Sequence, residues 1–309
     1  MAAVRRVVLV TSPNSRRATR LPRVRAALRR YELEVVDELP VDQLSRLPDL
    51  VRDRADRTGT PPLVVAAGGD GTVGAVANCL ANSQVVLGVL PLGTSNDFAR
   101  SLGIPMRIER AVGLLLTGKV STLDLGRVVA ADREPLHFVH AATVGLNVNF
   151  AKLATRASLR RRLGRFTYVF AAVLALGETR SFPCEITYDG RTERWHLTHL
   201  SVINAPVFGG FLGMRVSGSS PDDRLLDVLA VEDLPVRRML TVAVHQLFRI
   251  RKPVTGVHAL HVPKMRVHTE AALEVALDGE VRGSLPADFV VAGEALRVVT
   301  PVDFDDTDG

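Results

Sequence analysis

The stretch Leu63-Val64-Val65-Ala66-Ala67-Gly68-Gly69-Asp70-Gly71-Thr72 decides the fold of this chain. Its five apolar residues favour a buried β-strand, and the glycines that follow end that strand. Small residues with helical character continue from Val73 to Leu80. A strand, a glycine turn and a helix start in this order present backbone N–H groups and the positive end of a helix to an anion. The stretch therefore predicts a phosphate-binding turn.

Asp70 is the unusual residue in this turn. A carboxylate repels a phosphate unless a divalent metal lies between them, so Asp70 predicts a nucleotide bound with Mg²⁺. The neighbouring glycines lack the Cβ atoms that would hold a phosphate away from the backbone. The residues expected to hold the phosphates are Gly68, Gly69, Gly71 and Thr72.

A second turn of the same kind follows. Val85 to Leu90 indicates another buried strand, and it leads into Pro91-Leu92-Gly93-Thr94-Ser95-Asn96-Asp97-Phe98-Ala99-Arg100. Ser95 or Asn96 is placed to cap the next helix. Because adjacent parallel strands end at the same edge of a sheet, the two turns form one crevice. The residues expected in it are Thr94, Asn96 and Asp97, the last sharing the magnesium with Asp70.

Together these two turns resemble the diacylglycerol kinase catalytic domain family, which includes sphingosine and ceramide kinases and bacterial soluble lipid kinases. The first motif is shared with NAD kinases and phosphofructokinases, whereas residues 91–100 point to the lipid-kinase branch. The resemblance runs along nearly the whole chain. It implies an α/β protein with an N-terminal Rossmann-like parallel-sheet nucleotide domain followed by a β-sandwich-like domain. ATP and Mg²⁺ are the cofactors that it implies.

The pattern of predicted helices and strands changes near residue 125 and divides the chain into two domains. Residues 1–125 form the predicted ATP-binding domain, to which a C-terminal segment of residues 293–309 is expected to return. Residues 126–292 begin with a hairpin signal and form the predicted β-rich lipid-substrate domain. Within it, residues 151–176 are a helical insertion whose first part is basic and whose second part is apolar.

The family's first turn has the pattern Asn-Pro-x-Ser-Gly and touches nucleotide phosphate. In this chain Ser12 stands in place of the Asn and Arg16 in place of the Gly, whereas Pro13 and Ser15 keep the pattern. The resemblance therefore implies nucleotide contacts by Ser12, Pro13 and Ser15. The two substitutions leave open whether activity is retained.

A second, structural divalent ion is implied by residues 219–228, which resemble the family's Asp-Gly-Leu-Leu-Asp-Val loop. By position its ligands are Ser220, Asp223 and Leu225, partly through backbone oxygens. Arg224 replaces the family's glycine, so a guanidinium opposes the cation and the loop loses its most permissive residue. This substitution argues against the second metal.

The last chemical element is Leu277-Asp278-Gly279-Glu280. Taken alone, Asp-Gly between two strands indicates a hairpin turn with a solvent-facing Glu280. Phosphorylation of an alcohol, however, needs a carboxylate that accepts or orients the hydroxyl proton. The family's Asp-Gly-Glu supplies it, with the Glu as proton acceptor. We therefore expect Glu280 to act as the base, Asp278 to orient or bind metal, and Asp97 to complete the catalytic set.

Positive charge is clustered along the chain. The formal net charge is +6, residues 1–30 contain nine arginines and no acid, and residues 152–165 form a second basic cluster. Such clusters indicate a solvated face, a nucleic-acid patch or an anionic membrane surface. Because aromatic residues make up only 5% of the chain, a stacking platform for nucleic acid is disfavoured. We expect an anionic membrane as partner and no nucleic acid.

The sequence thus predicts an ATP- and Mg²⁺-dependent lipid kinase that phosphorylates the hydroxyl of a lipid such as diacylglycerol. Two unrelated cysteines, and no visible signal peptide or transmembrane stretch, indicate a cytoplasmic protein at the inner membrane face. A homo-oligomer is compatible with the sequence.

Two other functions stay open. One is a soluble-substrate kinase of the NAD kinase type, which shares the first glycine turn. The other is a non-catalytic regulatory protein at the membrane surface that keeps the kinase fold. A nucleic-acid binder rests on charge alone.

Overall fold

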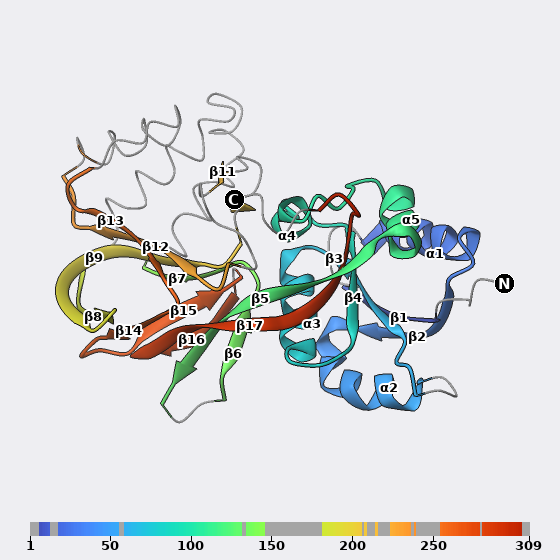
Figure 1. Ribbon diagram of the computed structural model, residues 1–309, viewed down its shortest axis with the longest axis horizontal. Coiled ribbons are helices and arrows are strands. Elements are labelled where there is room, and N and C mark those ends of the chain that lie inside the picture. The colour runs from blue at the N-terminus through green and yellow to red at the C-terminus, as the bar shows by residue number, and fades with distance from the viewer. Residues whose placement is uncertain are drawn as a thin grey trace.

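The computed structural model of this chain describes residues 6–12, 18–55, 59–131, 134–145, 181–205, 207–208, 214–215, 223–235, 238, 254–278 and 280–304. The predicted helical insertion at residues 151–176 lies outside the described residues. So do residues 13–17, which belong to the turn after the first strand. Figure 1 shows an α/β half that carries the N-terminus and a β-rich half beside it.

The first half alternates strands and helices, as its sequence pattern predicts. Its elements are β1 (Arg6–Thr11), the 3-10 helix η1 (Ala18–Arg20), α1 (Leu21–Arg30), β2 (Glu34–Pro40), the 3-10 helix η2 (Val41–Arg46), α2 (Leu47–Asp53), β3 (Leu63–Gly68), α3 (Asp70–Leu80), β4 (Val86–Pro91), α4 (Asp97–Ser101) and α5 (Ile108–Thr117).

The described residues of the second half lie mostly in strands. They are β5 (Lys119–Ala130), β6 (Leu136–Phe138), β7 (Ala141–Val144), β8 (Phe182–Tyr188), β9 (Arg191–Ile203), β10 (Val207–Phe208), β11 (Met214–Arg215), β12 (Leu226–Glu232), β13 (Val257–Val262), β14 (Lys264–His268), β15 (Leu273–Leu277), β16 (Glu280–Leu285) and β17 (Ala287–Thr300).

A parallel sheet forms the core of the first half. Strands β4, β3, β1 and β2 lie side by side in that order and all run in the same direction. Alternate residues of β1 and β3 face two separate apolar cores, one against α2 and α3 and the other against α1 and α5. Because both faces are covered, these strands are apolar throughout instead of alternating with polar residues.

Strand β17 ties the two halves together. Its first part pairs with β14 of the β-rich half, and Arg297 and Val298 pair in parallel with β4. Strand β5 runs antiparallel to nearly its whole length (Figure 1). Although β17 is one strand, its pairing with β5 has an irregularity between Ala292 and Leu296.

The predicted start of one helix and the predicted side-chain cap of another were wrong. Helix α3 begins at Asp70 instead of Val73, so Gly71 and Thr72 lie in its first turn. Asn96 precedes α4 in a left-handed conformation (φ 50°), and no side-chain hydrogen bond caps that helix. The Asn96 amide instead donates to the carbonyl of Gly93 at 2.9 Å, which closes the turn on itself.

The lengths of the helices show whether any of them could cross a membrane. Within the described part of the chain, no helix has both the length and the apolar character that crossing a bilayer requires.

We expect Phe289→Ala and Leu296→Ala each to lower the free energy of unfolding by about 3 kcal/mol, because each leaves a cavity in a packed core. Both side chains are fully buried on β17, but in different cores. Urea denaturation should show a single transition for both variants, since one strand serves both cores. Val302→Ala is the control, because Val302 is 70% exposed. Two separate transitions would contradict this coupling.

Candidate active site

The two glycine turns pack directly on one another. Gly68 pairs with Pro91 at the ends of β3 and β4, and its carbonyl accepts the N–H groups of Leu92 and Gly93 at 2.8 and 3.2 Å. A Cβ atom on Gly69 would lie 3.0 Å from the Cα of Gly93. The turns therefore need glycine for their own contact, in addition to any approach of a phosphate.

Each turn delivers an aspartate to the start of a helix. Asp70 opens α3 and Asp97 opens α4, and Asp70 Oδ1 accepts the N–H of Phe98 at 3.2 Å. Burial raises the pKa of the Asp70 carboxyl, and the nearby His140 and the Phe98 N–H oppose this only in part. The predicted pair of acids is thus brought to one place.

His140 joins these acids from the other half of the molecule. It lies between β6 and β7, is buried, and places Nε2 3.7 Å from Oδ2 of Asp97. Burial lowers its pKa most, but Asp97, Asp278 and Asp70 outweigh that effect and raise the pKa overall. Among the described residues, neither ring nitrogen has a hydrogen-bond partner. Sequence reasoning missed His140, because its role depends on a contact between residues far apart in the chain.

Asp278 organises the loop that carries His140. Its Oδ2 accepts the N–H of Val139 at 3.0 Å, and its Oδ1 accepts those of His140 and Ala141 at 2.8 and 3.3 Å. Burial raises the pKa of this carboxyl, against the opposing effect of the N–H donors. The carboxylate also lies against Gly74 of α3, where a Cβ atom would come within 2.7 Å of Oδ2. This geometry suits the orienting role.

Asn204 and Asp124 extend the same network. The Asn204 amide donates to the carbonyl of Asp124 at 3.0 Å, and its backbone N–H donates to the carbonyl of His140 at 2.8 Å. The buried Asp124 carboxylate accepts the backbone N–H groups of Arg224 and Glu294 at 2.9 and 2.8 Å. These bonds join β5 and β17 to the His140 loop.

A cavity of about 750 Å³ opens beside the first glycine turn. It is lined by Ser12, Val41, Asp42, Leu44, Ser45, Gly69, Gly71, Thr72, Ala75, Asn78, Cys79, Glu280 and Arg282. Glu280 reaches over the helix start, because a Cβ atom on Gly71 would lie 3.3 Å from its Oε1. The cavity therefore brings the expected base to the expected phosphate turn.

The remaining predicted residues lie around this cavity rather than on its wall. Gly68 is buried under Thr72, whose side chain fills the space of a Cβ atom, and Thr94 is exposed on the turn after β4. Asp97 and Asp278 lie near His140, and Asn96 directly precedes Asp97 at the start of α4. Pro13 and Ser15 lie outside the described residues.

Asp70 and Asp97 fit a magnesium ion whose remaining ligands would come from water and from substrate phosphates. Within the described ranges, no three imidazole, thiolate or carboxylate groups stand close enough to hold a metal by themselves. Mg²⁺ is commonly held by one or two carboxylates together with water and substrate phosphates. The buried Oδ1 of Asn96 has no hydrogen-bond partner in the described part of the chain, so this oxygen would be available to a cation held by Asp70 and Asp97.

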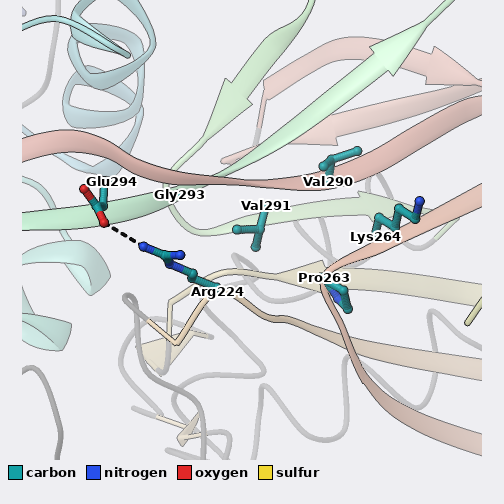
Figure 2. Close-up of a pocket in the computed structure, with 7 residues that line it drawn as sticks. All are labelled: Arg224, Pro263, Lys264, Val290, Val291, Gly293 and Glu294. Atoms are coloured by element: carbon teal, nitrogen blue, oxygen red, sulfur yellow. Dashed lines mark hydrogen bonds and ion pairs between the residues drawn. The ribbon is translucent and has the colours of Figure 1, made fainter.

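The loop predicted to hold a second metal has a different character. Ser220 lies outside the described residues, and Asp223 Oδ1 accepts the N–H of Leu225 at 2.8 Å. Arg224 is left-handed (φ 59°) and pairs with Glu294 at 2.7 Å. Figure 2 shows this pair at one end of a cavity of about 420 Å³, with Lys264 at the other end. Two cationic side chains argue against a divalent cation here.

Comparison with known proteins agrees with this architecture. Residues 6–128 match the family model described as diacylglycerol kinase catalytic domain, and residues 141–300 match the one described as YegS C-terminal NAD kinase beta sandwich-like domain. This chain also superposes on a solved structure of a protein from Bacillus anthracis strain Sterne, with a TM-score of 0.75 and 21% sequence identity. The superposition covers 97% of this chain and 96% of the other chain. The predicted fold class, a parallel-sheet α/β half followed by a β-sandwich-like half, is confirmed.

Sequence relatives identify the family. A diacylglycerol kinase of Bacillus subtilis strain 168 is 30% identical over 244 residues, which cover 77% of this chain and 78% of that protein. Another, from Mycobacterium tuberculosis strain H37Rv, is 29% identical over 244 residues, 77% of this chain and 76% of that protein. The chain belongs to the diacylglycerol kinase catalytic domain family, as the two glycine turns predicted.

We expect Asp278→Ala to lower the free energy of unfolding by about 3 kcal/mol, because three backbone N–H groups lose their acceptor. Asp278→Asn keeps one acceptor oxygen and should lose less. Thermal and urea denaturation measure both variants, with Asp53→Ala, an exposed aspartate at the end of α2, as the control. An Asp278→Ala variant as stable as the control would show that the His140 loop does not need this carboxylate.

Proposed function

We propose that this protein is an ATP- and Mg²⁺-dependent lipid kinase that phosphorylates the hydroxyl of a lipid such as diacylglycerol. The observation that carries this proposal is the position of Glu280, which lines the same cavity as Gly69, Gly71 and Thr72. A carboxylate beside a phosphate-binding turn is what transfer of a phosphoryl group to an alcohol requires. The names of the two curated relatives support the same activity.

Each group has a role in this reaction. The acceptor oxygen attacks the γ-phosphorus of ATP, its proton passes to Glu280, and the bond from phosphorus to the bridging oxygen of ADP breaks. The backbone of the first turn and the Thr72 hydroxyl bind phosphate oxygens, while Asp278 holds the His140 loop in place. Asp70 and Asp97, with Asn96, would hold Mg²⁺, which neutralises phosphate charge when bound. Catalysis then rests on positioning and electrostatics.

A lipid acceptor is favoured over a soluble one by residues 91–100, the turn that distinguishes the lipid-kinase branch. The arginine-rich segments would draw the protein to anionic lipid at the cytoplasmic face, since each basic side chain near the surface contributes about 1 kcal/mol. Nucleic acid is not expected as a partner, and a homo-oligomer is compatible with this role.

We expect Glu280→Gln to lower phosphate transfer at least about 100-fold, because the amide cannot accept the hydroxyl proton. The assay supplies Mg-ATP and lipid alcohols in mixed micelles, with NAD as a soluble acceptor. Glu274→Gln, an exposed change on the neighbouring strand β15, is the matched control and should keep full activity. Removal of Mg²⁺ by a chelator should stop transfer in all three proteins.

The outcome separates the candidate functions. Labelled lipid that disappears in the Glu280 variant supports the lipid kinase. Label in NAD alone assigns the protein to the soluble-substrate kinases. Nucleotide binding without transfer to any acceptor favours the regulatory protein, and sedimentation with anionic liposomes then tests that role.

A further inference from the structure

Arg282 is a half-buried cation on the wall of the candidate active-site cavity. It forms no ion pair within the described part of the chain, whereas Arg23, Arg25 and Arg266 each pair with a carboxylate. A half-buried guanidinium on a cavity wall without a carboxylate partner can bind an anion that enters the cavity. The side chain therefore has the environment of a ligand-binding group.

The backbone at this point gives a reason for its placement. Strands β15 and β16 pair Leu277 with Glu280 and Ala276 with Val281, but Val275 then pairs with Gly283. Arg282 is the extra residue of a β-bulge. Bulges occur often beside active sites, where they redirect a side chain. Both Glu280 and Arg282 line the cavity, while Val281 between them is 51% exposed.

The charges of the cavity wall point to the same conclusion. Its acids are Asp42 and Glu280, and Arg282 is the sole basic residue among the described residues that line it. A polyphosphate carries more negative charge than one divalent ion neutralises, and backbone N–H groups add only partial charges. An arginine offers paired donors in a geometry that suits phosphate oxygens.

We propose that Arg282 binds the terminal phosphate of a nucleoside triphosphate. This inference rests on the proposed kinase function and names a substrate-contacting residue for it. Arg282 lies two residues from Glu280, and the phosphate next to the base is the one that is transferred. The guanidinium therefore favours a triphosphate over a diphosphate, and it stabilises charge on the phosphoryl oxygens during transfer.

Equilibrium binding to the full chain with Mg²⁺ tests this proposal, using a non-hydrolysable ATP analogue and ADP as the two probes. Arg282→Gln should weaken binding of the triphosphate at least about 10-fold, the loss of a charge-assisted hydrogen bond to phosphate, and leave ADP binding within about 2-fold. Arg282→Lys should recover part of the loss, because the charge returns without the paired donors. Arg110→Gln, an exposed arginine on α5, is the matched control.

Equal weakening of both probes, or no change in either, would overturn the role at the terminal phosphate. Thermal denaturation of each variant distinguishes a folding defect from a lost contact, and the Lys variant serves if the Gln variant unfolds. The proposed function fails separately. It fails if the wild-type protein binds neither nucleotide or transfers phosphate to no lipid, whereas active wild-type protein with unaffected Arg282 variants overturns this inference alone.

Discussion

The candidate site depends on one half-buried carboxylate. Asp278 accepts three consecutive backbone N–H groups, from Val139 to Ala141, and lies against Gly74 of α3. It thereby fixes a loop of the β-rich half against a helix of the α/β half. Since His140 sits in that loop and Glu280 follows two residues after Asp278, the same hydrogen bonds place both groups at the glycine turns.

The negative charges of these acids are only partly balanced. Asp70, Asp97 and Asp278 are held near His140, and burial raises the pKa of both Asp70 and Asp278. Acids that share one imidazole repel each other unless more positive charge arrives. A divalent cation held between Asp70 and Asp97 would reduce this repulsion. That Asp70 binds a metal stays a prediction from the first turn.

The sequence predicted the strands and glycine turns, because interactions between residues close in the chain determine them. The strands β3 and β4 and their glycine turns follow from apolar runs that end at Gly68 and Pro91, and the family follows from those turns. His140 and Arg282 carry no such signal, because a long-range contact and a β-bulge define them. The cap at Asn96 failed for a similar reason, since its amide bonds backward to Gly93.

Arg224, which stands where the resembled family has glycine, has a left-handed backbone conformation. Arg224 and Glu294 are both left-handed, a conformation that costs a residue other than glycine about 1 kcal/mol or more. Each donates its backbone N–H to Asp124, and their side chains pair with each other. The carboxylate thus compensates the strain at both residues. Arg224 and Glu294 are thus held together by the Asp124 carboxylate and by their own ion pair, both of which are protein groups.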